Sequence, residues 1–202
     1  MLSCKTFSLA LAAACFAFFV WSSPIQIPLS SFEAISLSQT VKTNCSSPPD
    51  PPHSCVFYAA CLEPHFHCGS QGYPLGFGEK FCTKFNLPQN VGRLSDKGKE
   101  WMWDTMACLQ RALVTELDIP APSSSSEACK ALETKAFSTH APCYLSSGLC
   151  SLNPKDWAVI VDIIGIRTLF GTRDALRGAV EAGEGCLKFF AKEWDKGVEK
   201  EL

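Results

Sequence analysis

The residues best suited to chemistry are His140, Cys143 and Tyr144, which lie close together in the sequence. A histidine can act as a general acid or base near neutral pH, because its unperturbed pKa is about 6.5. The three residues fall between Cys129 and Cys150, whose sulfurs can instead fasten a helix at both ends. Two interpretations are therefore open at this stretch: an active site, and a helix held by disulfides.

The first interpretation resembles the secreted phospholipases A2, which place a calcium-binding glycine loop before a helix with His-Asp-x-Cys-Tyr-like residues. Here Ala141 follows His140, where that chemistry requires an aspartate to hold calcium. No aspartate occurs between Asp118 and Asp156. Without this carboxylate, calcium has no anionic anchor and cannot polarise an ester carbonyl. We therefore expect His140 to be a helix-end or surface residue, with a hydrolase that uses it as the alternative.

A second group of potential ligands is His65-Phe66-His67-Cys68, with His53 nearby. Imidazole and thiolate bind zinc, but a sulfur oxidised to a disulfide is a poor ligand. We expect exposed histidines in a cystine-rich loop, and neither a metal nor another cofactor. The glycine-rich stretch Gly69–Gly78 lacks the Lys-Ser/Thr pair of a phosphate loop, which argues against a nucleotide site.

Residues 1–22 have the features of a secretory signal, with Lys5 as the only charge and a short apolar core over Phe7–Trp21. We expect a secreted, extracellular protein without membrane insertion. The formal net charge is −2 and becomes more negative when Lys5 is removed, so nucleic acid is not an expected partner. The C-terminal Glu199–Leu202 approaches an ER-retrieval tetrapeptide, but Lys200 stands where an acidic residue is usual.

Residues 23–54 are rich in serine, threonine and proline, which predicts an N-terminal arm with little regular structure. Asn44-Cys45-Ser46 fits the glycosylation sequon, so Asn44 is a candidate glycan site. If Cys45 forms a disulfide, glycan addition competes with that pairing. Residues 55–202 follow as a single domain of ordinary size.

The apolar pattern predicts helices and no strand. Ser95 is a good N-cap for a helix over 95–117, whose apolar residues make one broad face. A second helix is expected from about Glu127 to His140. Pro142 should stop it or start a new helix, because proline clashes with the preceding helical turn.

Two further helices follow in the C-terminal part. Asn153, as an N-cap before proline, opens one of them, and Thr172 caps the other, which runs through Trp194. Four glycines and Pro74 in residues 69–78 predict an irregular, turn-rich loop. The expected class is all-α: a compact, disulfide-stapled helical domain with a cysteine-dense, loop-rich N-terminal part.

Removal of residues 1–22 takes away Cys4 and Cys15 and leaves an even number of cysteines. In an exported chain this predicts that all of them form disulfides, with no free nucleophilic thiol. The successive separations are 10, 6, 7, 14, 26, 21, 14, 7 and 36. The cysteines are Cys45, Cys55, Cys61, Cys68, Cys82, Cys108, Cys129, Cys143, Cys150 and Cys186.

This series resembles that of the stanniocalcins, secreted helical glycoprotein hormones, cysteine for cysteine. The local sequence agrees over most of the mature chain. Cys61-Leu62-Glu63 is similar to the family's Cys-Leu-Glu, and Gly98-Lys99 begins a segment similar to its Gly-Lys-x-Phe…Cys helix. Cys143-Tyr144 and Cys150-Ser151 match its Cys-Tyr…Cys-Ser segment at the same separation.

The resemblance implies a pairing pattern, and each such disulfide is worth roughly 3–4 kcal/mol in the chain-entropy model. Stanniocalcins are typically covalent dimers through a further cysteine beyond the tenth. No cysteine follows Cys186 here, so we expect no disulfide-linked dimer, while a non-covalent dimer remains open. The implied pairs are Cys45–Cys61, Cys55–Cys82, Cys68–Cys129, Cys108–Cys143 and Cys150–Cys186.

For function, the resemblance implies a secreted, non-enzymatic, hormone-like glycoprotein that binds another extracellular protein, in signalling or ion homeostasis. Tyr73 and Phe77 of the expected loop are the candidate contact residues, because rigid aromatic side chains on a fastened loop make good contacts. Two alternatives stand beside this hypothesis. One is the phospholipase A2-like hydrolase with His140, and the other is a secreted structural or effector protein with an unrelated partner.

Overall fold

The computed structural model describes residues 43–120 and 125–201, which belong to one compact unit, Val41–Leu202. The predicted signal and most of the predicted arm lie outside the described residues. Over the described ranges the chain forms helices and no strand, so the all-α prediction is confirmed. No helix among them is long and apolar enough to cross a membrane.

Five disulfides fasten the described part of the chain, and they are the five pairs that the resemblance implied. Three of them involve the N-terminal segments, and the other two join later helical segments to one another. Their Cα–Cα distances lie between 5.0 and 5.7 Å, within the usual range for disulfides. The pairs are Cys45–Cys61, Cys55–Cys82, Cys68–Cys129, Cys108–Cys143 and Cys150–Cys186.

The cysteine-dense N-terminal part contains two continuous helical stretches. The π-helical segment η1 (Tyr58–Leu62) continues as α1 (Glu63–Phe66). A second π-helical segment, η2 (Tyr73–Glu79), continues as α2 (Lys80–Asn86). The prediction of an irregular loop over residues 69–78 is therefore wrong from Tyr73 onward.

The glycines of this stretch allow close packing. A Cβ atom on Gly78 would lie 2.5 Å from the ring of Tyr58, and one on Gly72 would lie 2.3 Å from the Cβ atom of Cys68. A close-packed interior has no room for such an atom. Gly72 and Gly78 are therefore positions where the backbone lies in close contact with its neighbours.

Helix α4 (Asp96–Arg111) begins at the predicted N-cap, where Ser95 Oγ accepts a hydrogen bond from the Gly98 N–H at 3.1 Å. It ends before the predicted residue 117, and the 3₁₀ segment η3 (Val114–Asp118) follows. The short helix α3 (Pro88–Val91) precedes α4.

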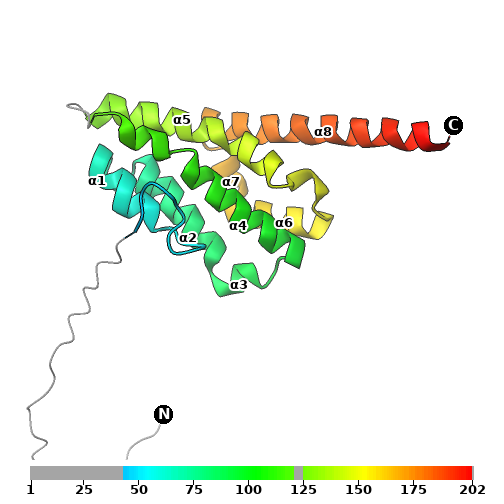
Figure 1. The fold of residues 1–202 in the computed structure, drawn as a ribbon, viewed down its shortest axis with the longest axis horizontal. Helices are drawn as coiled ribbons and strands as arrows, with labels where there is room; N and C mark the ends of the chain where they lie inside the picture. Colours follow the sequence, from blue (N-terminus) through cyan, green and yellow to red (C-terminus); the bar gives the residue numbers. More distant parts are fainter. Residues whose placement is uncertain (1–42, 121–124, 202) are drawn as a thin grey trace, which may run out of the picture. The chain divides into compact units, whose positions relative to one another are not determined.

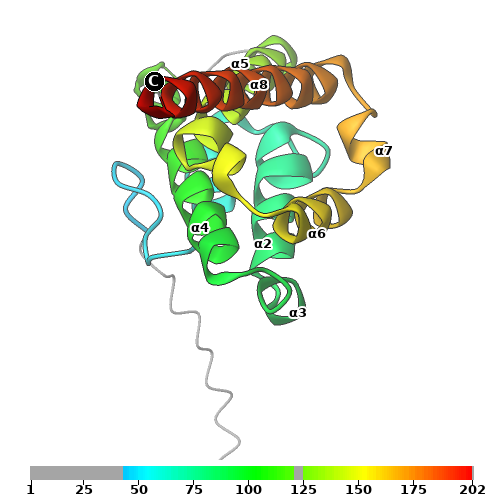
Figure 2. The same cartoon turned by 90° about the vertical axis from the view of Figure 1, so that its right-hand side faces the viewer.

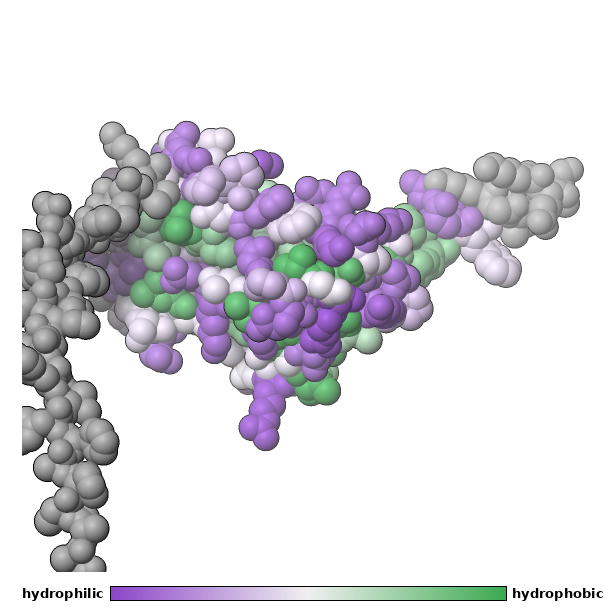
Figure 3. Space-filling view, turned by 90° about the horizontal axis from the view of Figure 1, so that it is seen from below, coloured by the Kyte–Doolittle hydropathy of each residue, from purple (hydrophilic) through white to green (hydrophobic). Residues whose placement is uncertain are grey.

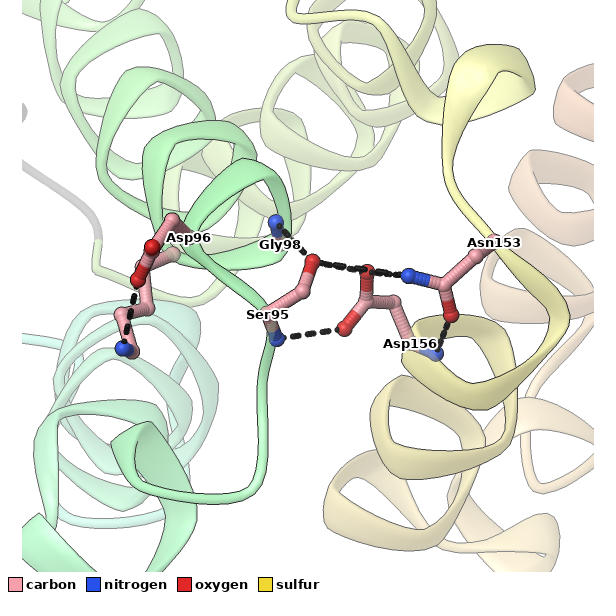
Figure 4. A network of polar contacts seen from close by, with 6 residues as sticks. Ser95, Asp96, Gly98, Asn153 and Asp156 are labelled. Carbon is pink, nitrogen blue, oxygen red and sulfur yellow. Dashed lines mark hydrogen bonds and ion pairs between the residues drawn. The ribbon is translucent and has the colours of Figure 1, made fainter.

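A fully buried carboxylate joins the start of α4 to the start of α6 (Pro154–Ile164). Asp156 accepts hydrogen bonds from the backbone N–H of Ser95 at 2.8 Å, from its hydroxyl at 2.6 Å and from the amide of Asn153 at 2.7 Å (Figure 4). Both helix N-termini carry partial positive charge, which stabilises this anion. The network thus fixes α6 against α4.

Helix α5 (Ser125–Ser146) does not stop at Pro142 but runs through it. A proline inside a helix costs about 3 kcal/mol. The residues on either side, Ala141 and Cys143, are buried, and Cys143 is bonded to Cys108 of α4. This disulfide, worth roughly 3–4 kcal/mol, and the burial of its neighbours offset the cost of the proline.

The C-terminal part comprises the 3₁₀ segment η4 (Leu149–Ser151), the short helix α7 (Ile166–Leu169) and the long helix α8 (Arg173–Glu201). Helices α5 and α8 lie side by side, and α8 extends past the other helices of this unit (Figures 1 and 2). A Cβ atom on Gly185 would lie 2.4 Å from Leu145, so glycine permits this close pairing.

Candidate functional site

The candidate glycan site is exposed, but the next residue is bonded to the core. Asn44 lies on the surface, and its side-chain oxygen accepts a hydrogen bond from the Ser46 N–H at 3.1 Å. Cys45 is paired with Cys61. Attachment of a glycan at Asn44 therefore stays a prediction, and the folded chain leaves this side chain accessible.

The two aromatic residues predicted to contact a partner lie inside the molecule. Tyr73 is 4% exposed, and its ring packs against Phe77 at a centroid distance of 5.7 Å and against Phe137 of α5 at the same distance. Phe77 is half-buried. The prediction of a surface contact site is therefore corrected, because close packing around the glycines turns both rings toward α5.

His140 is likewise a core residue and not the helix-end or surface residue expected. It lies within α5 at 6% exposure. Its Nε2 is 3.1 Å from the Tyr73 hydroxyl and its Nδ1 is 3.2 Å from the Tyr144 hydroxyl. Phe77 and Phe137 pack around the imidazole.

Tyr73, His140 and Tyr144 form what we call the Tyr–His–Tyr cluster, and its apolar environment keeps all three side chains uncharged. Burial lowers the pKa of His140 from 6.5 to about 4, so the imidazole is neutral at physiological pH. Burial also raises the pKa of Tyr73 and of Tyr144, so both phenols retain their protons. Among the described residues the imidazole hydrogen-bonds to no carboxylate. The arrangement therefore stabilises a neutral histidine and does not increase its basicity.

A cavity of about 90 Å³, partly open to solvent, adjoins this cluster and is lined by η1, η2, α2, α4, α5, α6, α7 and α8. Aromatic and aliphatic side chains make up most of its wall. The lining residues with polar side chains are those of the Tyr–His–Tyr cluster, Tyr58, Trp101, Thr105 and Thr168. This combination of an apolar wall with a few convergent polar groups is typical of a small-molecule site.

The largest row of exposed apolar side chains in the described part of the chain runs along the outer face of α8. Leu187 is 70% exposed, Phe190 is 52% exposed and Trp194 is 76% exposed. We call the row the α8 stripe. Its members are Leu176, Val180, Gly183, Leu187, Phe190 and Trp194.

The α8 stripe repeats with the spacing of a coiled-coil seam. Its residues are separated alternately by four and three positions, which is the 3.5-residue period of two paired helices. Nothing lies within 4 Å of a Cβ atom placed on Gly183, so the middle of the stripe is open. The opposite face of α8, with Ala182 and Cys186 buried, packs on the rest of the unit.

The C-terminal half of α8 projects away from the other helices (Figure 1). Every side chain described from Leu187 to Asp195 is exposed. Figure 3 shows hydrophobic surface on this projecting part, beside hydrophilic residues. The 4–3 spacing of these large residues was visible in the sequence, but nothing there indicated that small residues would take the inner face.

The histidines of the His65-Phe66-His67 stretch, for which the sequence predicted no metal, differ in their environment. His67 is exposed, while the Nε2 atom of His65 is buried without a hydrogen-bond partner. Over residues 43–120 and 125–201, no group of three or more histidine, cysteine or acidic side chains is arranged to hold a metal ion.

No family model, curated protein or solved structure matches this chain.

Proposed function

We propose that this protein is a secreted, non-enzymatic, stanniocalcin-like glycoprotein that acts by binding another extracellular protein through the α8 stripe. The observation that carries the proposal is the row of large apolar side chains that α8 holds away from the core, with Trp194 the most exposed among them. Exposed aromatic and aliphatic residues of this size mark interaction surfaces. The five disulfides support secretion.

The spacing of the stripe favours a helix as the partner. Alternation of four and three residues brings about one side chain per turn into a seam, and a second helix buries that seam. The projecting half of α8 also gains order from a partner, because isolated helices shorter than about 12–15 residues are marginal in water. Gly183 lets the partner's backbone approach closely.

A second copy of the chain is the partner that we propose, because each copy carries the same stripe and a twofold axis brings two such stripes together. Two such stripes bury on the order of 1,000 Å², which is near the lower limit for a specific interface.

Sedimentation equilibrium of the secreted protein tests this proposal. The wild type should form a non-covalent dimer, and Leu187→Gln with Phe190→Gln should weaken the association at least tenfold. Lys188→Gln with Lys192→Gln is the matched control on the polar side of the same helix turns, and it should leave the dimer intact.

Equal effects of the two double variants would contradict a role for the stripe. A wild type that stays monomeric would exclude the second copy as partner. The stripe would then require a different protein, and binding to that protein should be lost in the first double variant and retained in the second.

The non-enzymatic part of the proposal has its own test. Both ring nitrogens of His140 are engaged by phenols, which leaves neither free to take a proton from water. Purified protein assayed on phospholipid vesicles with calcium should therefore show no hydrolysis that His140→Ala abolishes. Hydrolysis that depends on His140 would establish the lipase-like alternative.

A further inference from the structure

We propose that the cavity beside His140 binds a small, uncharged, mostly apolar molecule with one oxygen that accepts a hydrogen bond. This site is separate from the α8 stripe, which lies on the outer face of α8, whereas the cavity is walled in part by Ala175 and Ala179 on the inner side of that helix. Three properties of the cavity support this ligand class: the hydrogen-bond donors in its wall, its charge and its size.

The Tyr–His–Tyr cluster has one donor more than it can use. A neutral imidazole carries one N–H, and Tyr73 and Tyr144 each carry one O–H, so the cluster holds three donor hydrogens. Its two contacts, at Nε2 and at Nδ1, consume one hydrogen each. Whichever tautomer His140 adopts, one phenol accepts from the ring and keeps its own hydrogen unshared within the cluster.

Thr105 does not supply a second donor. Its hydroxyl is buried without a hydrogen-bond partner and is out of reach of a molecule in the cavity. The unshared phenol hydrogen is therefore the donor that an acceptor oxygen in the cavity meets, since Tyr73 and Tyr144 both line the wall. A buried donor without a partner costs about 1–3 kcal/mol, and the ligand oxygen removes this cost.

The wall is electrically neutral, which restricts the ligand. No lysine, arginine, aspartate or glutamate lines the cavity, and the imidazole is uncharged at physiological pH. A buried carboxylate or ammonium without a partner of opposite charge is strongly disfavoured. The ligand class is therefore a ketone, aldehyde, ester or ether, and not an acid or an amine.

The volume of the cavity limits the size of the ligand. A cavity of about 90 Å³ is smaller than the roughly 150 Å³ apolar cavity that takes benzene in another protein. The enclosed part of the ligand therefore has the size of a five-membered ring or a short branched chain. The less buried residues of the wall, Phe81 of α2, Leu169 of α7 and Ala179 of α8, mark the side from which a ligand approaches.

Two probes of the same shape test the proposal: cyclopentanone, which has the acceptor oxygen, and methylenecyclopentane, which has a CH₂ group in its place. Binding is followed by the chemical shifts of the methyl groups and aromatic rings in the cavity wall. In the wild type both should bind. Replacing all three cluster residues (Tyr73→Phe, His140→Phe and Tyr144→Phe) removes every donor of the cluster and should weaken the ketone about tenfold relative to the hydrocarbon, the value of one hydrogen bond.

Ala179→Phe fills the cavity and should abolish binding of both probes, whereas Ala191→Phe on the exposed side of α8 should not. Absence of binding by either probe in the wild type, with only water in the cavity, would overturn the proposal. So would an equal effect of the triple phenylalanine variant on the two probes. The outcome is independent of sedimentation, so this site and the α8 stripe can fail separately.

Discussion

Two aromatic groups in this molecule occupy the opposite environments from those that local sequence suggests. Tyr73 and Phe77 belong to a stretch rich in glycine and proline, yet they pack around His140. Phe190 and Trp194 belong to a long amphipathic helix, yet they face outward. The difference shows that large side chains are buried where their neighbours are small enough to admit close packing.

Small residues make both arrangements possible: at η2 they allow aromatic rings to be buried, and on α8 they leave aromatic rings exposed. Gly72 and Gly78 bring η2 against Cys68 and Tyr58, which carries Tyr73 inward. On α8, Ala182 and Gly185 take the contact with the rest of the unit, which leaves Leu187 and the aromatic residues outside. Small residues thus accompany buried aromatic side chains at η2 and exposed aromatic side chains on α8.

The largest expected effect comes from cutting the disulfide that anchors α8. Cys150→Ala with Cys186→Ala removes a bond that closes a 36-residue separation, which should lower the free energy of unfolding by about 4 kcal/mol in the chain-entropy model. Denaturant unfolding measures this. The same variant should also expose the inner face of α8. If the free energy of unfolding fell by less than 1 kcal/mol, packing on α5 alone would be sufficient to hold the helix.

The second-largest expected effect is a pH dependence of the free energy of unfolding, which arises from His140 in the buried aromatic group. The pKa of His140 is about 4 in the folded chain and about 6.5 in the unfolded chain. Between these values the unfolded chain binds a proton that the folded chain does not, so stability falls as the pH is lowered. The loss should begin near pH 6.5 and reach about 3 kcal/mol near pH 4.

Unfolding free energies at a series of pH values check this expectation. His140→Phe should remove this contribution to the slope, while His67→Asn, at an exposed position with positive φ that asparagine tolerates, should retain it. A wild-type slope that survives in His140→Phe would assign the pH dependence to other groups.

Two glycine-to-alanine substitutions should change the stability of the fold in opposite directions. Gly78→Ala places a Cβ atom 2.5 Å from the Tyr58 ring and should destabilise the fold by about 1–3 kcal/mol. Gly183→Ala adds its Cβ atom to open space in a helix and should stabilise the monomer by about 0.5–1 kcal/mol. Melting temperatures at low protein concentration compare the two, and destabilisation by both would show that Gly183 also lies in a close contact.

The smallest expected effect is on the outer aromatic group. Trp194→Gln should change the stability of the monomer by less than about 0.5 kcal/mol, because the ring makes little contact with the core. The same substitution should weaken association of the α8 stripe. A large loss of stability in the monomer would mean that Trp194 packs on its own chain.

The class of fold and the position of α4 followed from local signals. Ser95 is an N-cap of the usual kind, and the even number of cysteines predicted a disulfide framework. The disulfide pairing came from the resemblance, not from spacing, because many pairings satisfy the same separations. All five pairs are present in the structure.

The sites were predicted less well because they depend on contacts distant in sequence. Tyr73 meets His140 across 67 positions, and no local pattern indicates such a contact. Pro142 lies inside α5 because a disulfide and buried neighbours hold the helix on both sides of it. The α8 stripe was visible as a spacing, but its exposure follows from the small residues on the opposite face.

The measurement that tests the role of the α8 stripe most directly is amide hydrogen exchange of residues 187–195 at low and high concentration of the secreted protein. We expect rapid exchange at low concentration, because these residues form a helix without packing in the monomer. Exchange should slow at least tenfold as two stripes pair, and Leu187→Gln with Phe190→Gln should remove that change. Equal exchange rates at all concentrations in the wild type would contradict pairing of the stripe.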